Sequence, residues 1–162
     1  MKEHRTPLDW FWVVLATVGF VGWIPWRVVK FKKMKGSGLL GTLVGWGVLW
    51  KMPESGVWFW GALIGGVVLA VWASHEAEKT LTYDDPRIVI DEVVGVWVAC
   101  IALPRTWGPM VAGLILFRLF DVMKGPWGRA VSRWPGGVGI VADDLLAGGI
   151  ANALVWVGMI LS

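Results

Sequence analysis

The apolar residues of this chain fall into six runs separated by short polar segments. The runs cover residues 10–26, 38–50, 57–73, 93–103, 110–120 and 145–161. A helix needs about 20 apolar residues to cross a bilayer, and only the first, third and last runs approach that length. None shows the two-residue alternation of a transmembrane β-strand. The pattern predicts an all-α, polytopic membrane helical bundle with short or re-entrant helices, in a single domain over residues 1–162.

The composition agrees with a membrane setting. Of the 162 residues, 56% are hydrophobic, and the mean hydropathy is +0.63. The chain has 14 Trp against one Tyr, and many of these Trp residues lie near the ends of apolar runs. Trp prefers the bilayer interface, where the ring is apolar and the N–H finds water. For Trp97 and Trp156, deep inside their runs, packing in the protein core is the expected role.

The basic residues predict an orientation. If all six runs cross and the chain starts outside, eleven Lys and Arg lie inside and four outside. The outer four are Lys2, Arg5, Lys51 and Arg105. This positive-inside bias predicts an integral protein of the cytoplasmic (inner) membrane. No cleavable signal peptide is expected, because Ile24-Pro25-Trp26-Arg27 is a poor cleavage site.

Five carboxylates stand inside or at the edges of the apolar stretches: Asp91, Glu92, Asp121, Asp143 and Asp144. A charge in hydrocarbon is costly, so such residues usually have a function. The alternative for Asp91 and Glu92 is a favourable place in the first turn of a helix. Gly95, one turn after Asp91, leaves room for another helix or a ligand. The same threading gathers all five on the cytoplasmic face, and an all-oxygen set favours a hard cation, Mg²⁺.

Basic and hydroxyl side chains near these carboxylates are candidates for binding phosphate. Arg118 and Lys124 flank Asp121 at three-residue steps, which indicates either a salt-bridge ladder or a metal ligand between two phosphate-binding cations. Ser37 and Thr42, in a glycine-rich segment, could donate to phosphate, although capping of the next helix is their default role. The basic segment 27–35 is interpreted mainly as a cationic anchor at an anionic leaflet.

Several classes of function are excluded or disfavoured. A net charge of +3 on a mostly apolar chain argues against nucleic-acid binding. His4, His75 and Cys100 are too few and too isolated in sequence for a zinc site or a His-based nucleophile. A headgroup transferase would need a nucleotide-diphosphate motif, which is absent from the sequence. An ion or proton carrier using the buried carboxylates stays open as the alternative, although grouping of the charges at one face argues against it.

Three segments, in order, resemble the phosphatidylglycerophosphatase A family. They are DPRIVIDEVVG (85–95), FRLFDVMK (117–124) and GGVGIVADD (136–144). The resemblance covers the chain from about residue 36 to the C-terminus. It implies an all-helical, membrane-embedded, Mg²⁺-dependent phosphatase that converts phosphatidylglycerophosphate to phosphatidylglycerol. Two departures concern the phosphate side: SGLLGT (37–42) lacks the usual Pro and first Thr, and GPWG (125–128) replaces a Pro-x-Pro segment.

These lines together predict a metal-assisted phosphomonoester hydrolase acting at the cytoplasmic face. The five carboxylates are expected to hold one or two Mg²⁺, which activate a water. Arg118 and Lys124, with Ser37 and Thr42, are expected to bind the phosphate. One carboxylate acting as general base or covalent nucleophile stays an open alternative. The expected partners are a phospholipid substrate and the membrane, and nothing in the sequence indicates an oligomer.

Overall fold

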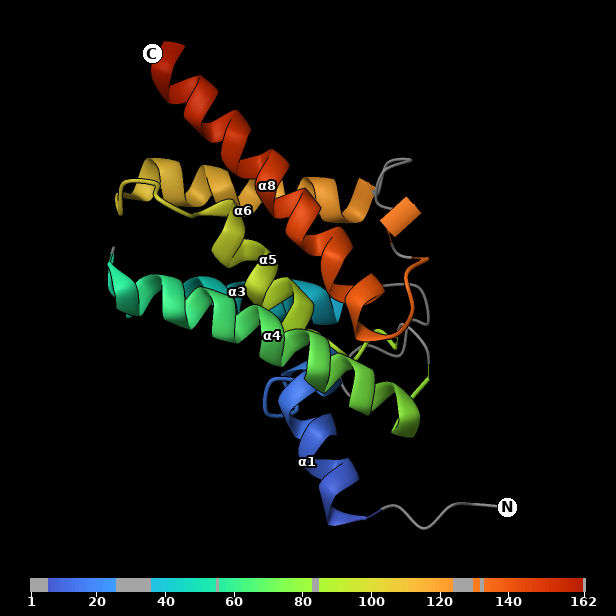
Figure 1. Cartoon of the computed structure of the whole chain (residues 1–162). Coiled ribbons are helices and arrows are strands. Elements are labelled where there is room, and N and C mark those ends of the chain that lie inside the picture. Colours follow the sequence, from blue (N-terminus) through green and yellow to red (C-terminus); the bar gives the residue numbers. More distant parts are fainter. Residues whose placement is uncertain are drawn as a thin grey trace.

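A computed structural model describes residues 6–25, 36–54, 56–82, 85–123, 130–131 and 133–161. Over these ranges the regular secondary structure is entirely helical, which confirms the all-α prediction. The elements are α1 (Pro7–Ala16), the 3₁₀ turn η1 (Val21–Trp23), α3 (Gly36–Leu49), α4 (Val57–Thr80), α5 (Ile90–Ala99), α6 (Trp107–Met123) and α8 (Gly137–Leu161). Figure 1 shows α5 enclosed by the neighbouring helices.

Two helices in the described part of the chain are long and apolar enough to cross a bilayer, α4 with 24 residues and α8 with 25. Both present apolar side chains to their surroundings, among them Ile64 (61% exposed) on α4 and Ile160 (78% exposed) on α8. Both are also longer than their apolar runs, since α4 continues to Thr80 and α8 begins at Gly137. Exposed apolar faces of this kind suit a lipid environment.

The first apolar run is not one continuous helix. Helix α1 ends at Ala16, and the Thr17 hydroxyl donates to the carbonyl of Val13 at 2.7 Å. The next residues turn back with positive φ angles, 51° at Val18, 64° at Gly19 and 67° at Phe20. A left-handed stretch of this kind cannot continue an α-helix. The first apolar run, residues 10–26, therefore does not form one helix of nearly membrane-spanning length, contrary to the expectation from its apolar length.

Helices α3 and α5 run side by side with closely spaced backbones. An ideal Cβ on Gly41 would lie 2.7 Å from the Cβ of Val89, and one on Gly45 would lie 2.7 Å from the Cα of Val93. Both separations are shorter than real side chains allow, so glycine is required where α3 meets α5. The indole N–H of Trp97 adds a hydrogen bond of 2.8 Å to the Gly45 carbonyl.

The bundle has two distinct ends, defined by contacts along α3. At the end of α3, Arg105 donates to the carbonyl of Leu49, and Trp50 lies against Trp107 with ring centroids 5.4 Å apart. At its start, Gly38 lies against Glu92 and Arg118. The first turn of α5 and the last turns of α6 therefore lie together at the same end of the bundle (Figure 1).

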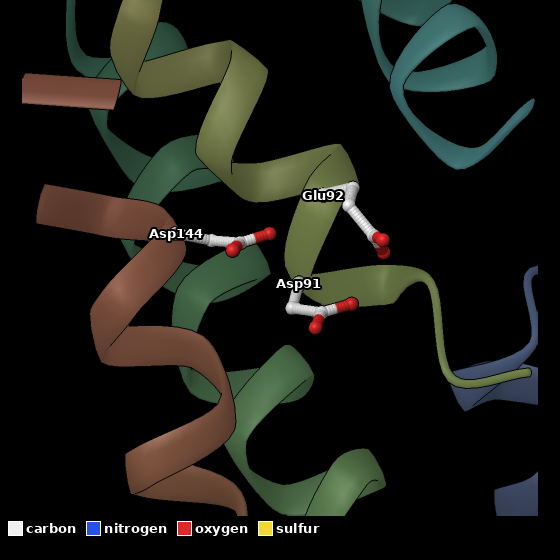
Figure 2. Close-up of side chains that lie close together, drawn as sticks. All are labelled: Asp91, Glu92 and Asp144. Atoms are coloured by element: carbon white, nitrogen blue, oxygen red, sulfur yellow. The ribbon is translucent and has the colours of Figure 1, made fainter. Parts of the chain in front are cut away.

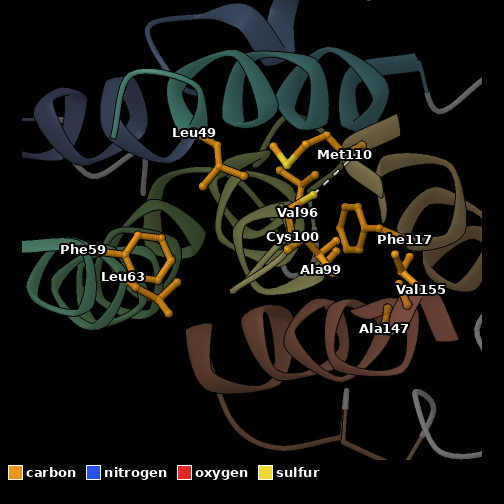
Figure 3. Packing of buried hydrophobic residues seen from close by; sticks show 12 residues of the cluster. Leu49, Phe59, Leu63, Val96, Ala99, Cys100, Met110, Phe117, Ala147 and Val155 are labelled. Atoms are coloured by element: carbon orange, nitrogen blue, oxygen red, sulfur yellow. Dashed lines mark hydrogen bonds between the residues drawn. The ribbon is translucent and has the colours of Figure 1, made fainter. Parts of the chain in front are cut away.

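The main core fills the space between these two ends. Figure 3 shows Leu49, Val96, Met110 and Phe117 packed around α5, with Phe59 of α4 reaching the same cluster. The Cys100 thiol lies among them, 3.8 Å from the carbonyl of Met110. Burial of these apolar side chains fixes α5 at the centre of the bundle and holds its acidic first turn at one end.

Candidate active site

Three carboxylates from two helices meet at the first turn of α5. Asp91 and Glu92 project from that turn, and Asp144 reaches toward them from the second turn of α8 (Figure 2). One oxygen from each of the three lies within 4.8 Å of the others. We call this set the acidic cluster. Three oxygen ligands at this spacing have the chemistry of a site for a hard divalent cation.

Glycines in α5 and α8 permit this convergence. An ideal Cβ on Gly95 would lie 3.1 Å from the Cβ of Asp144 and 2.6 Å from the ring of Phe117. A Cβ on Gly148 would overlap the Gly95 carbonyl. The expectation that Gly95 leaves room for a neighbouring helix is therefore confirmed: Phe117 of α6 and Asp144 of α8 both lie against it.

Helix α6 brings a cation to the cluster. Arg118 donates from Nη1 to Asp121 Oδ2 at 2.7 Å and to the Thr42 hydroxyl at 3.2 Å. Thr42 in turn donates to the carbonyl of Gly38 at 2.8 Å. A Cβ on Gly38 would overlap Glu92 Oε1 and lie 3.1 Å from Arg118 Nη1. The start of α3 therefore forms one wall of the site, against which Glu92 and Arg118 both lie.

Helix α5 has ten residues and is too short to span a bilayer. Burial in the protein raises the free energy of the charged forms of its carboxylates. The pKa of Asp91 is raised well above its ordinary value by burial and then by the charge of Glu92. Burial likewise raises the pKa of Glu92 to about 8, with a further increase from the charges of Asp144 and Asp121. A bound cation would stabilise the ionised forms.

Shielded oxygens in the cluster fit a metal ion. Asp91 Oδ1 and Glu92 Oε2 are buried and have no hydrogen-bond partner among the described residues. A buried acceptor without a partner is destabilising unless something else supplies the positive charge. The cluster offers only oxygen ligands, the set that Mg²⁺ prefers.

Of the remaining predicted site residues, the structure describes Asp143, Asp121 and Ser37. Asp143 is buried on α8, and its negative charge acts on Asp91. Asp121 is held by Arg118 on α6. Ser37 donates its hydroxyl to the carbonyl of Pro86, which ties the start of α3 to the segment before α5. Lys124 and the basic segment 27–35 lie outside the described residues.

The segment before α5 is itself fixed by charge. Asp85 accepts hydrogen bonds from the backbone N–H of Arg87 at 3.0 Å and from its Nε at 2.7 Å. Burial alone would raise the pKa of Asp85, but the hydrogen bonds and charge of Arg87 outweigh it and lower that pKa. The Arg87 guanidinium also lies 4.7 Å from the ring centroid of Trp23. Asp85 and Arg87 therefore stabilise the turn that leads into α5.

One polar residue with a structural role was not singled out from the sequence. Asn152 of α8 donates from Nδ2 to the carbonyls of Ala99 at 3.1 Å and Ile101 at 2.8 Å, where α5 ends. These carbonyls have no partner within the helix, so Asn152 caps α5 from another helix. The available signal was an amide side chain in the middle of the apolar run 145–161.

Comparison with known proteins identifies the family. The model described as "Phosphatidylglycerophosphatase A" matches residues 14–159. The chain belongs to the phosphatidylglycerophosphatase A family. It is therefore an enzyme of the phosphatase class, as the three sequence segments had indicated. Family membership, together with α4 and α8, also indicates a membrane protein.

Three relatives share substantial parts of the sequence. A Bacteroides thetaiotaomicron protein named "Putative phosphatidylinositol-3-phosphatase" is 34% identical over 68% of this chain and 72% of its own length. Escherichia coli phosphatidylglycerophosphatase A is 35% identical over 56% of this chain and 55% of its own. The Haemophilus influenzae protein of the same name is 39% identical over 40% and 41%. No solved structure matches this chain.

Proposed function

We propose that this enzyme removes the terminal phosphate of phosphatidylglycerophosphate, giving phosphatidylglycerol and inorganic phosphate, and that it requires Mg²⁺. The observation that carries the proposal is the convergence of Asp91, Glu92 and Asp144 within 4.8 Å, beside Arg118. A cation site next to a guanidinium suits a phosphomonoester, whose oxygens need positive charge on more than one side. The family description and two of the relatives' names support this particular lipid.

The acidic cluster would hold the metal, with Asp143 and Asp121 available as further ligands or as acceptors for its water. Bound Mg²⁺ neutralises phosphate charge and lowers the pKa of a coordinated water. The ligands come from two different helices, α5 and α8, which supports a site that forms only in the folded bundle.

Arg118 would bind the phosphate oxygens. Its guanidinium is held by Asp121 and Thr42, so its direction is set before substrate arrives. A fixed donor loses little entropy as charge shifts onto the phosphoryl oxygens in the transition state. Lys124, three residues after Asp121, would add a second positive charge.

One of the five carboxylates would also either accept a proton or form a covalent bond to the phosphoryl group. In one route a carboxylate accepts the proton of a water that attacks phosphorus; the P–O bond to the lipid breaks, and the lipid alkoxide leaves and takes up a proton to become the alcohol. The other has a carboxylate attack phosphorus, displace the lipid alkoxide and form an acyl phosphate that water then hydrolyses. A phosphorylated Asp trapped at low pH would distinguish the second route from the first.

The site would lie at the cytoplasmic face of the inner membrane. The start of α3 and the last turns of α6 border the cluster, and the basic segment 27–35 immediately precedes α3. Clustered Lys and Arg residues are typical of the cytoplasmic side.

The proposal is tested by phosphate release from phosphatidylglycerophosphate by purified protein in detergent, with Mg²⁺ and with EDTA. We expect Mg²⁺-dependent release, and losses of at least about 100-fold in Asp91→Asn and Asp144→Asn, because each removes a metal ligand. Glu54→Gln, which changes an exposed carboxylate elsewhere, is the matched control and should retain activity. Release that is unaffected by EDTA, or full activity in Asp91→Asn, would refute the assignment. Phosphatidylinositol 3-phosphate, assayed in parallel, tests the choice of headgroup.

A further inference from the structure

A groove of about 490 Å³ lies between the second half of α4 and the first turn of α8. Its walls are mostly apolar and include Val68 and Trp72 of α4 and Val138 of α8. This volume is within the range of sites that bind small molecules. The groove is separate from the acidic cluster, whose residues do not line it.

The groove is a built feature of the contact between α4 and α8. Gly136 turns the chain into α8 with a φ of 61°, a conformation that favours glycine. Gly137 then lies directly on the backbone of α4, where a Cβ would overlap the Val71 carbonyl. The first turn of α8 is thus fixed against α4, and the side chains of Val68, Trp72 and Val138 line the open space beside this contact.

Lipid hydrocarbon is the natural occupant of this space. The groove is bordered by the two helices that are long and apolar enough to cross a bilayer. Its wall residues are well exposed, Val68 at 58% and Trp72 at 59%. Along α4 the lining changes from valines to His75 and Glu76, and Glu76 is paired with Lys79 at 2.6 Å. An apolar channel that ends in polar groups matches a lipid whose acyl chain meets its headgroup region.

The groove lies near the acidic cluster along α8. Val138 precedes Asp143 and Asp144 by five and six residues on α8. At 1.5 Å per residue, this places the groove wall about 8–9 Å along the helix axis from the acidic cluster. The groove and the acidic cluster therefore lie less than two helical turns apart along α8.

We propose that this groove holds an acyl chain of the lipid substrate while the headgroup phosphate lies at the acidic cluster. The inference rests on the proposed lipid phosphatase activity and adds to it a chain-binding subsite. Binding of an acyl chain in the groove contributes to the rate only if it positions the phosphate at the acidic cluster. Filling of the groove by the chain should therefore raise kcat/KM for a long-chain substrate.

The test fills the groove and compares two substrates. Val68→Trp places a large side chain in the groove, and Ile64→Trp, one turn earlier on α4 and similarly exposed (61%) but outside the lining, is the control. We expect Val68→Trp to lower kcat/KM for long-chain phosphatidylglycerophosphate about tenfold, the equivalent of about two buried methylenes. Hydrolysis of a short-chain, water-soluble analogue should change less than about twofold, since the acidic cluster is intact. Ile64→Trp should match the unmodified enzyme with both substrates.

Other results would overturn the subsite. Equal losses with both substrates would mean that the substitution damages the site, and no loss with either would mean that the groove holds only bulk lipid. A binding readout separates this proposal from the proposed function. A lipid phosphate with a photoactivatable acyl chain should crosslink near Trp72 or Val138 in the unmodified protein and not in Val68→Trp. Crosslinking there without any hydrolysis would refute the activity alone, and crosslinking elsewhere would refute the subsite.

Discussion

At Gly38, the absence of a side chain determines where Glu92 can lie. A Cβ there would overlap Glu92 Oε1, the end of a flexible side chain, so an added methyl group can displace the carboxylate without moving a helix. We expect Gly38→Ala to lower kcat/KM about 10–100-fold and to raise the Mg²⁺ concentration needed for activity, because Glu92 leaves the cluster. Activity against Mg²⁺ concentration and thermal unfolding in detergent are the measurements.

The matched control for Gly38→Ala is Gly47→Ala on the same helix, where a Cβ meets nothing within 4 Å. It carries the same change in helix propensity and should leave the Mg²⁺ dependence unchanged. If Gly38→Ala has the same Mg²⁺ dependence as this control, Glu92 is not held at the site by α3.

The orientation of Arg118 gives a second prediction at this scale. Nη1 of Arg118 donates to both Asp121 and Thr42. Lys in place of Arg118 keeps the charge but not the planar guanidinium that fixes this nitrogen and offers further N–H donors to phosphate. We expect Arg118→Lys to lower kcat about 10–100-fold. Thr42→Val, which keeps the shape and removes one hydrogen bond to the guanidinium, should cost only about fivefold. Steady-state kinetics of both variants decide the matter, and an inactive Thr42→Val beside a fully active Arg118→Lys would contradict this arrangement.

The sequence was informative about single residues where the residue type conflicted with its surroundings. Asp91, Glu92 and Asp144 stood out as carboxylates at the edges of apolar runs, and the structure brings them together. Gly38 and Asn152 act on partners more than 50 residues away in sequence. Their contribution depends on which helices are neighbours, and no local pattern carries that information.

At the scale of elements, the contact between α3 and α5 requires glycine at position 45. This requirement is stricter than the one for glycine at position 38 in the site. A Cβ on Gly45 would meet the backbone of Val93 at 2.7 Å, and backbone cannot rotate away as the Glu92 side chain can. We expect Gly45→Ala to force the helices apart and to destabilise the protein by about 1–3 kcal/mol. Thermal unfolding in detergent should show a lowered midpoint with Gly45→Ala and little change with Gly47→Ala. Equal midpoints would mean that the helices are not in such close contact.

Apolar runs located the helices well but not their ends. Helix α4 continues past the run through Ser74 to Thr80, because polar residues are compatible with a helix once it leaves the apolar layer. The break after Ala16 was not predictable by hydropathy, since Val18 and Phe20 are apolar residues in a left-handed turn. Tertiary contacts stabilise that turn: the Ala16 carbonyl accepts from the Val89 N–H at 2.9 Å.

For the whole molecule, the two ends of the bundle have different chemistry. At the end with Arg105, Trp50 and Trp107, the last turn of α3 is held by the Arg105 guanidinium and by indoles in tilted contact. The opposite end carries the acidic cluster and Arg118. Helix α4 connects the two, so its passage through the membrane would separate them. The basic residues carry the proposed direction of that passage.

Chemical labelling tests that orientation. Lys51 follows α3 at one end, Arg133 precedes α8 at the other, and both side chains are exposed. The single native Cys100 is buried, so background labelling should be low. With a membrane-impermeant maleimide, Arg133→Cys should react in inside-out vesicles and Lys51→Cys in right-side-out vesicles. The reverse pattern would place the active site outside, and labelling of both variants from the same side would mean that α4 does not cross. Either result would leave the proposal of a metal at the acidic cluster intact but would require the substrate to reach it from a different leaflet or from water.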